Sequence, residues 1–458
     1  MNIRTALAIT ACRASRALLR RLGKGGTNLP GEIALKICPD ILKRLSEGVS
    51  VIIITGTNGK TTTARMVEQM LIDSGVSYFA NKSGANLMAG ITAEFAIHSS
   101  ARSGKCKCDV ALIESDEAAL KYVCGFVDAK VIAVTNVFRD QLDRYGEVTH
   151  TVENIRLGME KCPDAIVCLN ADDPLSGGLG RTRSGRVSYY GVDVPVYRET
   201  FRETSDAAYC RICGGKLSYD YVTYAHLGGF RCPSCGAARP EPELRVTELS
   251  VSDGDHSLVT VTADGISHEI SINLPGAYNI YNAVCALSVG RAFGLDHEVI
   301  ATSLSSFEGG FGRLEDFKLG DTPARMILVK NPAGCDQAIH FLAESPVPLV
   351  MAFCLNDKAQ DGKDISWIWD AGFENLKGLG DKLVRVYASG IRAEDMALRL
   401  YYAGIDPEKI VTEKDKNKLI DLLTEEKEKV IIVPTYTAML SVRGLIAERF
   451  GYKEYWEL

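Results

Sequence analysis

Short apolar runs alternate with helical patterns along the first part of the chain. Apolar runs of strand length occur at Val51–Thr55, Val110–Ile113, Lys130–Val134 and Ala165–Leu169. Between them, Ala64–Ser74 and Ile155–Lys161 repeat apolar residues at helical spacing. Because strands that alternate with helices pair in parallel, this pattern predicts an α/β unit, a parallel sheet flanked by helices.

The pattern changes after residue 200. Cys, Gly, Tyr and Pro recur at short spacing around Tyr209–Pro240, and Leu244–Leu274 then alternates in the manner of antiparallel strands. We interpret this as an insertion, at about 206–240, followed by a return to the first unit. A helix is predicted at Ala277–Phe293, followed by the glycine-rich hinge Phe307–Gly312.

A second α/β pattern begins near residue 326. Its predicted strands are Met326–Val329, Leu349–Phe353, Leu383–Val386 and Val430–Val433. With 458 residues the chain is too long for one hydrophobic core, so several domains are expected. We predict three parts: an N-terminal basic helix and lead-in at 1–45, a central domain at 46–312, and a smaller C-terminal α/β domain at 313–458.

The N-terminal segment carries its charge on the wrong side for a secretory signal. Arginines at positions 13, 16, 20 and 21 follow the apolar Ala6–Ile9, and no small-residue cleavage site is evident. A basic amphipathic helix is expected, which either packs on the protein's own surface or contacts an anionic membrane face. No stretch of about 18 apolar residues occurs, so we expect a cytoplasmic protein.

The composition excludes an overall positive charge of the kind that attracts nucleic acid. The formal net charge is −6, with 46% hydrophobic and 24% charged residues. Binding to a polyanion would therefore have to be local.

A phosphate-binding loop is predicted where the first apolar run ends. Val51–Ile54 leads directly into Thr-Gly-Thr-Asn-Gly-Lys-Thr-Thr-Thr at 55–63, and a helical pattern follows. Such a loop points backbone N–H groups at phosphate oxygens, Lys60 neutralises them, and the Thr61 hydroxyl can hold Mg²⁺. The residues expected to bind the nucleotide here are Gly56, Thr57, Asn58, Gly59, Lys60, Thr61 and Thr62.

Four of the fourteen cysteines form two CxxC turns, each followed by glycine. Cys210, Cys213, Cys232 and Cys235 have zinc-ribbon spacing, and four thiolates leave no open position for catalysis, so a structural Zn²⁺ is predicted. Disulfides and a redox CxxC are the alternatives. Basic residues alternate with tyrosines in this segment, so nucleic-acid binding is a second, less favoured hypothesis.

The loop at 55–63 resembles the Mur ligase family, in which ATP phosphorylates a carboxylate and an amine then captures the acyl phosphate. Further matches follow in the family's order: Ser83–Asn86, Glu114–Glu117, Thr135-Asn136 with Asp140 and Asp143, Gly276–Ala283, and Gly312–Glu315.

The resemblance implies site roles. Glu114 would be a second Mg²⁺ ligand beside Thr61, although it could also be a plain acidic strand end. Asn279, Asn282 and Arg313 would position the nucleotide, and Lys60 and Glu114 would be catalytic. The part at 46–312 would be the central ATP-binding domain.

The chain also departs from the usual ligases. Gln141 stands where they have His, and no lysine is identifiable as a carbamylated metal bridge. The family's Asp-x-x-His-Asn-Pro reads Val329-Lys330-Asn331-Pro332, without the acid or the His. The nucleotide half is therefore retained while the half for the incoming amine is rebuilt.

These departures, the four cysteines, and the segments Gly23–Gly31 and Leu355–Asp370 resemble the MurT family over essentially the whole chain. The resemblance implies the synthetase subunit of a lipid II isoglutaminyl synthase. Such a subunit uses ATP to amidate the α-carboxylate of D-glutamate in the stem peptide to D-isoglutamine. Its ammonia comes from a GatD-type glutaminase, with which it forms a heterodimer through the C-terminal domain.

The residues agree with a separate ammonia source. No Gly-x-Cys-x-Gly setting occurs, and none of the seven histidines has an evident Cys-His context. By the same resemblance, Asp364 would orient the partner's catalytic His, with Asp357 or Asp361 as alternatives. These carboxylates could instead only cap their loop and the following helix.

Two other functions stay open from the sequence. One is a Mur-type ligase that adds an amino acid to a peptide or folate-like acceptor. The other is an NTP-driven protein that uses its ribbon on nucleic acid.

Overall fold

The structure is a computed structural model. It describes residues 3–21, 27–81, 85–140, 148–196, 206–252, 256–274, 276–307, 313–343, 345 and 347–453. Ser83, Gly84, Gln141, Asp143 and the predicted hinge residues 308–312 lie outside this set.

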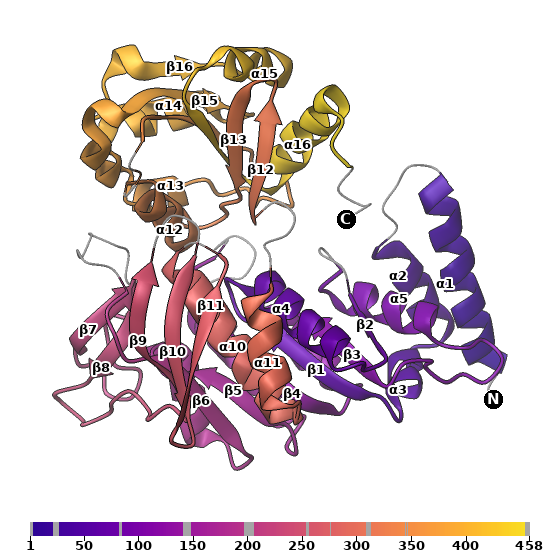
Figure 1. The fold of residues 1–458 in the computed structure, drawn as a ribbon. Helices are drawn as coiled ribbons and strands as arrows, with labels where there is room; N and C mark the ends of the chain where they lie inside the picture. The colour runs from indigo at the N-terminus through magenta and orange to yellow at the C-terminus, as the bar shows by residue number, and fades with distance from the viewer. Residues whose placement is uncertain are drawn as a thin grey trace.

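Three N-terminal helices form one side of the molecule (Figure 1). They are α1 (Ile3–Arg21), α2 (Leu29–Ile37) and α3 (Ile41–Ser46). The expected basic helix is thus present as α1, and it packs on α2 and on α5 (Met88–His98). Among the described helices, none has both the length and the apolar character needed to cross a membrane.

The central part of the described chain is built on a nine-stranded sheet in the order β11-β10-β9-β6-β5-β4-β1-β3-β2. Strands β1 to β6 are joined by parallel pairing, and β6 pairs in parallel with β9. The strands are β1 (Ser50–Thr55), β2 (Tyr78–Ala80), β3 (Val110–Glu114), β4 (Ala129–Val134), β5 (Ile166–Asn170), β6 (Val187–Val192), β9 (Leu244–Ser252), β10 (Ser257–Ala263) and β11 (Ile266–Ile272).

The strands β9, β10 and β11 pair antiparallel at one edge of this sheet. The chain therefore returns to the first sheet after the insertion, as the sequence predicted. The sheet is mixed because these three strands follow one another through short turns, and short turns allow only antiparallel pairing.

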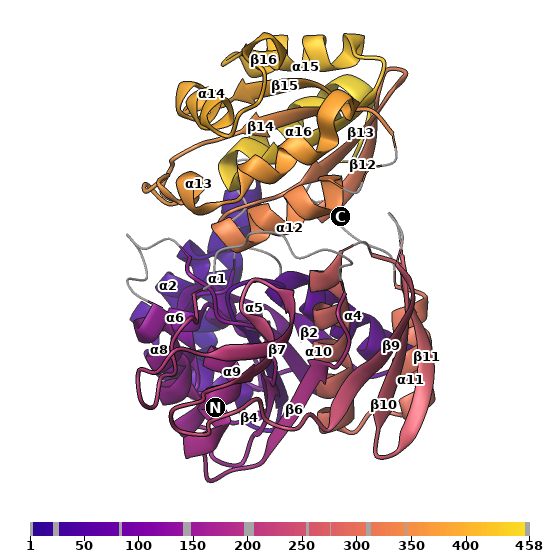
Figure 2. The same cartoon turned by 90° about the vertical axis from the view of Figure 1, so that its left-hand side faces the viewer.

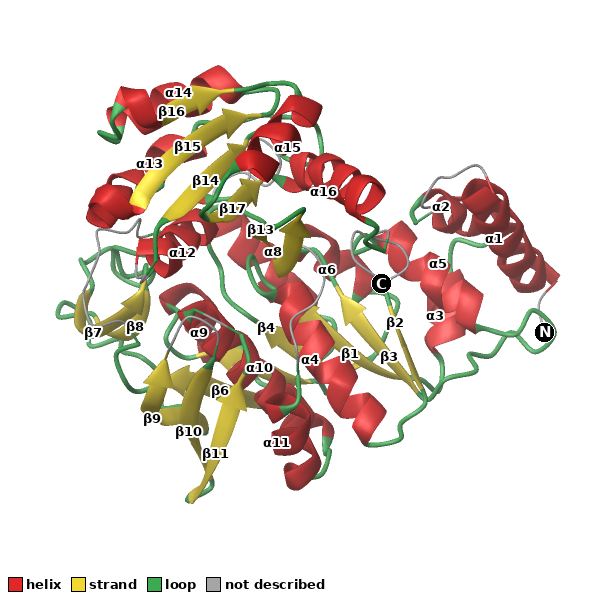
Figure 3. Cartoon of the chain, turned by 45° about the horizontal axis from the view of Figure 1, so that its top comes forward, coloured by secondary structure: helices red, strands yellow, loops and turns green. Residues whose placement is uncertain are grey.

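Helices cover both faces of the central sheet (Figures 1 and 3). Successive residues of β1 face opposite cores: Val51 and Ile53 lie with α3, α5 and α8, while Ile52 and Ile54 lie with α4 and α10. The helices are α4 (Lys60–Asp73), α6 (Glu117–Val123), α8 (Val148–Glu160), α9 (Pro174–Leu179) with η1 (Gly180–Thr182), α10 (Ala277–Phe293) and α11 (His297–Ser305).

A small hairpin projects from the central part. Its strands β7 (Ser218–Tyr224) and β8 (Leu227–Arg231) pair antiparallel beside the four cysteines. Phe230 and Leu217 form a separate small core with Cys210 and Cys232.

The C-terminal part lies above the central sheet, on a six-stranded sheet in the order β12-β13-β17-β14-β15-β16 (Figure 2). Only the β12–β13 pair is antiparallel. The strands are β12 (Arg313–Leu319), β13 (Thr322–Ile327), β14 (Leu349–Cys354), β15 (Leu383–Ser389), β16 (Ile410–Thr412) and β17 (Lys429–Pro434).

Helices cover the second sheet on both faces, over two apolar clusters. They are α12 (Pro332–Ala343), α13 (Trp367–Asp370), η2 (Phe373–Lys382), α14 (Ala393–Tyr402), η3 (Pro407–Lys409), α15 (Lys416–Glu425) and α16 (Tyr436–Phe450). The α/β class is thus confirmed. We retain 1–45, 46–312 and 313–458 as a proposed domain division.

Candidate functional site: a phosphate loop between two sheets

The phosphate loop turns from β1 into α4 on two glycines that no other residue could replace. Gly56 has a φ of +118° and Gly59 a φ of +85°. A Cβ at Gly59 would lie 1.9 Å from Asn282 Oδ1, and one at Gly56 would lie 2.3 Å from Thr135 Oγ1. Glycine is required because both the left-handed backbone and the close neighbours exclude a side chain.

The end of β4 holds the loop in place. Thr57 N donates to Asn136 O (2.9 Å), and Asn58 N donates to Asn136 Oδ1 (2.9 Å). Phe138 N donates to Thr57 Oγ1 (3.0 Å), and Thr135 Oγ1 donates to Asn58 O (2.7 Å). The family match at Thr135-Asn136 thus has a physical role here, which is to support the phosphate loop.

Lys60 is buried and turned toward its own loop. Its ammonium donates to Gly56 O and lies 3.1 Å from Glu117 Oε2. Burial works to lower the pKa of Lys60, but the carboxylates of Glu117 and Glu114 outweigh it and raise that pKa. Lys60 is therefore held as a cation at the position where phosphate oxygens are expected.

Glu117 was not predicted as a site residue. Burial raises the pKa of its carboxyl, against the opposing effect of the Lys60 charge. Glu117 belongs to the acidic run Glu114–Glu117 after β3. No neighbouring residue in the sequence distinguished it from an acid that merely begins a helix.

Thr61 and Glu114, the two residues expected to hold Mg²⁺, lie side by side. Thr61 Oγ1 donates to Glu114 Oε2 at 2.9 Å. Hydroxyl and carboxylate oxygens at one point suit Mg²⁺, and the donor set fits that ion.

Asn81 places Glu114 and was missed from the sequence. Its amide donates to Glu114 O (2.8 Å) and Ala85 O (3.0 Å), and its Oδ1 accepts from Glu114 N (2.7 Å). Asn86 is joined to the acidic run at Glu114–Glu117, because Asp116 N donates to Asn86 O (3.0 Å).

The residues expected on the nucleotide's other side lie on α10. Asn282 Nδ2 donates to Asn279 Oδ1 (3.0 Å), both side chains are buried, and Asn282 lies against Gly59. Thr62 is half-buried in the first turn of α4. The side chain of Arg313 lies outside the described set, so only its place at the start of β12 is known.

The C-terminal part reaches this loop directly. Asn331 Nδ2 donates to Asn58 Oδ1 (3.0 Å), and Lys330 Nζ lies 2.5 Å from Asp140 Oδ2. Arg139 also lies 3.4 Å from Asp370. Lys330 occupies the place of the family's His, and no sequence pattern predicted a role for it.

The three candidate aspartates after β14 differ in their contacts. Asp361 is buried and accepts from Thr437 N (2.7 Å) and Thr437 Oγ1 (2.5 Å). Asp357 pairs with Arg392 Nε (2.7 Å). Asp364 is half-exposed and accepts from Ser366 N (2.8 Å), and hydrogen bonds from Ser366 lower the pKa of its carboxyl.

The four ribbon cysteines converge. All four sulfurs lie within 4.8 Å of one another, with Cys210–Cys235 at 3.6 Å and Cys213–Cys232 at 3.5 Å. Four thiolates about 2.3 Å from one tetrahedral Zn²⁺ would be separated by roughly 3.8 Å. The set therefore fits zinc.

The ribbon segment also contacts the loop after β4. Asp206 Oδ2 accepts from Arg139 N (2.8 Å), and the His226 ring lies 4.5 Å from that of Phe138. The backbone N–H of Phe138 in turn donates a hydrogen bond to Thr57 Oγ1 of the phosphate loop.

A second set of contacts joins the hairpin to α10. Thr223 Oγ1 and Tyr281 OH are 2.7 Å apart, and Tyr281 OH donates to Asp172 Oδ2 (2.5 Å). Burial raises the pKa of Asp172 to about 6, although Arg239 and Tyr281 oppose it. The ribbon thus contacts both the loop after β4 and helix α10, the two segments that pack against the phosphate loop.

Comparison with known proteins gives two family matches. Residues 54–213 match the Mur ligase middle domain, and residues 328–439 match the MurT ligase C-terminal domain.

Relatives match over nearly the full length. The MurT subunit of the glutamine-hydrolysing lipid II isoglutaminyl synthase of Streptococcus pneumoniae is 36% identical, over 98% of each chain. The corresponding subunit of Staphylococcus aureus strain COL is 32% identical, over 94% of this chain and 95% of that one.

Among solved structures, a pseudomurein peptide ligase type C from Methanothermus fervidus superposes with a TM-score of 0.68. It is 21% identical and covers 90% of this chain and 81% of its own, so it supports the fold alone.

Proposed function

Because the chain belongs to the MurT family of Mur ligase-like proteins, we propose that it is the synthetase subunit of a lipid II isoglutaminyl synthase. It amidates the α-carboxylate of D-glutamate in the lipid II stem peptide to D-isoglutamine, at the expense of ATP. The reaction runs through an acyl phosphate and uses ammonia from a GatD-type glutaminase.

The observation that carries this proposal is the loop at 56–62 with Lys60, Thr61 and Glu114 converging beside a rebuilt C-terminal segment. Mur ligases use ATP with Mg²⁺. Here Thr61 and Glu114 would hold that ion, which offsets phosphate charge and orients the terminal phosphoryl group.

The first step is phosphoryl transfer. A carboxylate oxygen of D-glutamate forms a bond to the γ-phosphorus of ATP, and the bond from that phosphorus to the β,γ-bridging oxygen breaks, releasing ADP. Lys60 and the loop N–H groups neutralise the moving charge, while Asn279, Asn282 and Arg313 fix the nucleotide. Lys60 would leave Glu117 for the phosphates as they enter.

The second step is capture by ammonia. Its nitrogen bonds to the acyl carbon, phosphate leaves, and a proton is lost from nitrogen, which yields the amide. Ammonia needs no pocket for an amino-acid side chain, so the loss of the family's acid and His at 329–332 agrees with this nucleophile.

We further propose a heterodimer with the glutaminase, in the cytoplasm, with no nucleic-acid partner. Asp364 would orient the partner's catalytic His, because it is the candidate aspartate without a buried or ion-paired carboxylate in the described structure. One structural Zn²⁺ would sit on Cys210, Cys213, Cys232 and Cys235.

The test is ATP-dependent amidation of lipid II by the purified chain. Product is expected with ammonium alone, and with glutamine only when a GatD-type partner is present. If ATP is hydrolysed only when an amino acid is added, the chain is instead an amino-acid-adding ligase and the proposal fails.

A further inference from the structure

Helix α1 carries an apolar stripe on the side that faces away from the protein. Ile3, Leu7 and Leu18 are exposed by 83%, 57% and 60%. With 100° between successive residues, these three positions and the exposed Ala14 fall within roughly 60° of one another around the helix axis. A surface helix normally presents charged residues on this face.

The opposite face of α1 is already buried. Thr5, Ala8, Ile9 and Cys12 pack toward α2 and α5. The outer stripe is therefore not needed to attach the helix to the protein.

The charge on α1 is of one sign. The helix contains five arginines and no acidic residue, within a chain of net charge −6. Arg13 and Arg16 point inward, to the carbonyls of Ile97 and Ser99 and to Glu94 at 3.1 Å.

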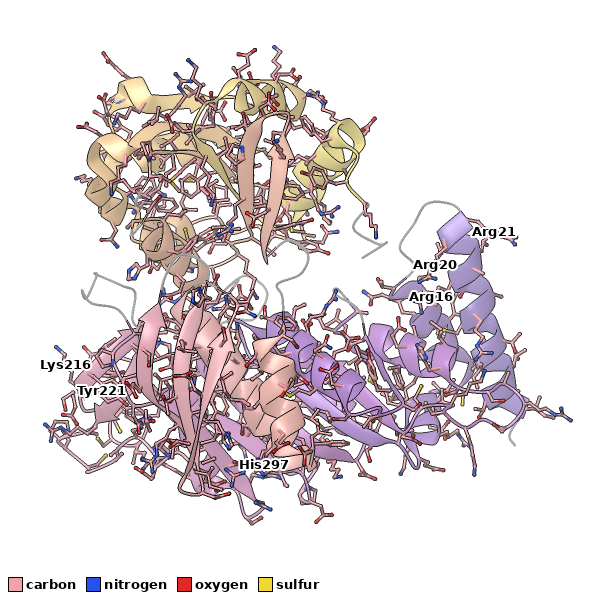
Figure 4. All side chains as sticks on the ribbon, in the orientation of Figure 1. Arg16, Arg20, Arg21, Lys216, Tyr221 and His297 are labelled. Atoms are coloured by element: carbon pink, nitrogen blue, oxygen red, sulfur yellow. The ribbon has the colours of Figure 1, made fainter. Side chains whose placement is uncertain are left out.

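Arg20 and Arg21 differ from these two. Both are exposed at the C-terminal end of α1, and within the described part of the chain neither forms an ion pair (Figure 4). Arg21 continues the line of the apolar stripe, and Arg20 lies about 100° from it around the helix axis.

We propose that this outer face of α1 is a docking surface for an anionic lipid membrane. An apolar stripe with arginines beside it matches the layering of a bilayer surface, where acyl chains lie beneath phosphate headgroups. The inference rests on the proposed function in one respect: a lipid-linked substrate requires the enzyme to work at a membrane.

The helix is connected to the catalytic site by α5. The far end of α5 is held by Arg13 through Ile97 O and Ser99 O. Its near end begins at Met88, two residues after Asn86, whose carbonyl accepts from Asp116 N in the acidic run. Eleven residues of helix span about 16 Å, so a single helix joins α1 to the acidic run beside the phosphate loop.

The experiment is sedimentation of the full-length protein with vesicles of phosphatidylcholine, with and without phosphatidylglycerol. Binding is expected only with the anionic lipid and should weaken as salt increases. Arg20→Glu with Arg21→Glu should weaken partitioning by about thirtyfold or more, since each basic residue near such a surface contributes about 1 kcal/mol. Leu7→Asp with Leu18→Asp should also lower it.

Matched controls lie away from α1, on the ribbon, where Lys216 is labelled (Figure 4), and at the start of β11, where Ile266 lies. Arg211→Glu with Lys216→Glu makes the same change in charge at exposed positions, and Ile212→Asp with Ile266→Asp replaces apolar side chains exposed by 64% and 60%. These variants should bind vesicles like the wild type.

Equal loss of binding in the α1 and control variants, or no binding of the wild type, would overturn the proposal. The proposal would also be overturned if the α1 variants kept vesicle binding but no longer self-associated, or no longer bound the glutaminase, in size-exclusion chromatography. The stripe would then be a protein interface. Amidation of a lipid-free stem peptide should be unchanged in the α1 variants. Absence of that amidation in the wild type, with vesicle binding retained, would refute the proposed function and leave this inference standing.

Discussion

Single residues at the phosphate loop are held in place before any nucleotide arrives. Lys60 is ion-paired with Glu117 at 3.1 Å, and Thr61 and Glu114 are hydrogen-bonded at 2.9 Å. An unpaired buried ammonium would be costly, so these acids keep Lys60 charged and aligned for phosphate.

A prediction at this scale concerns Asp364. Asp364→Asn keeps the shape of the side chain but removes the charge that would stabilise the partner's imidazolium. Glutamine hydrolysis by the reconstituted complex should fall by roughly a hundredfold or more, as when the orienting acid of a catalytic triad is lost. Ammonium-dependent amidation and ATP affinity should not change.

The control is Asp357→Asn, which alters a neighbouring carboxylate that is paired with Arg392. It should keep near-normal glutaminase activity. Unchanged hydrolysis in Asp364→Asn would show that this carboxylate only caps the start of α13.

At the scale of elements, the ribbon hairpin is attached to the nucleotide site on two sides. Asp206 and His226 contact the loop after β4, and Thr223 contacts Tyr281 on α10. Because four thiolates and a metal determine the hairpin's shape, loss of the metal should loosen both supports of the phosphate loop.

The corresponding prediction is for Cys213→Ser with Cys235→Ser, two exposed positions whose replacement leaves no buried cavity. Zinc content by elemental analysis should fall from about one per chain toward zero. ATP affinity by calorimetry should fall about tenfold or more, and the melting temperature should drop.

Cys106→Ser with Cys108→Ser is the matched control, because these cysteines are only partly buried and lie outside the ribbon. It should retain zinc and ATP affinity. A metal-free wild-type protein that is folded and binds ATP normally would contradict the role given to the ribbon.

For the whole molecule, the two sheets meet where chemistry is expected. Lys330 and Asn331 from the C-terminal part contact Asp140 and Asn58 beside the phosphate loop. The Asp140 carboxylate and the acyl phosphate are both anionic. We therefore expect the Lys330 ammonium to leave Asp140 and to bind the acyl phosphate once that intermediate forms.

Lys330→Met should accordingly lower kcat for ammonium-dependent amidation by roughly a hundredfold, the effect of removing one charge-stabilising donor. ATP affinity should change little, because Lys60 and the loop amides remain. Lys414→Met is the control, since it removes a lysine whose ion pair with Glu394 is exposed. A kcat equal to that of the control would leave Lys330 only an interdomain contact.

Local patterns recovered much of the architecture. The helix predicted at Ala277–Phe293 has those bounds as α10, and the strand Leu349–Phe353 differs from β14 by one residue. The strand predicted at Met326–Val329 is instead β13 at Thr322–Ile327. Val329 lies beyond the end of β13 but is still buried, and its N–H donates to Pro434 O of the neighbouring β17 (3.0 Å).

The sequence by itself determined the phosphate loop, the four-cysteine ribbon and the α/β class. Each depends on residues close together in the chain, where spacing alone restricts the backbone or the ligand geometry. The family resemblance extended this to Thr61 with Glu114, which the structure brings together.

Only the tertiary structure decided which other groups meet. Asn58 and Asn331 are 273 positions apart, Thr223 and Tyr281 are 58 apart, and Lys60 and Glu117 are 57 apart. No local period encodes such pairs, because they depend on how strands order within a sheet and how two sheets are placed. The exposed stripe of α1 was likewise decided by the tertiary structure. The sequence pattern predicted an amphipathic helix, and packing on α2 and α5 decided which of its apolar side chains were left exposed.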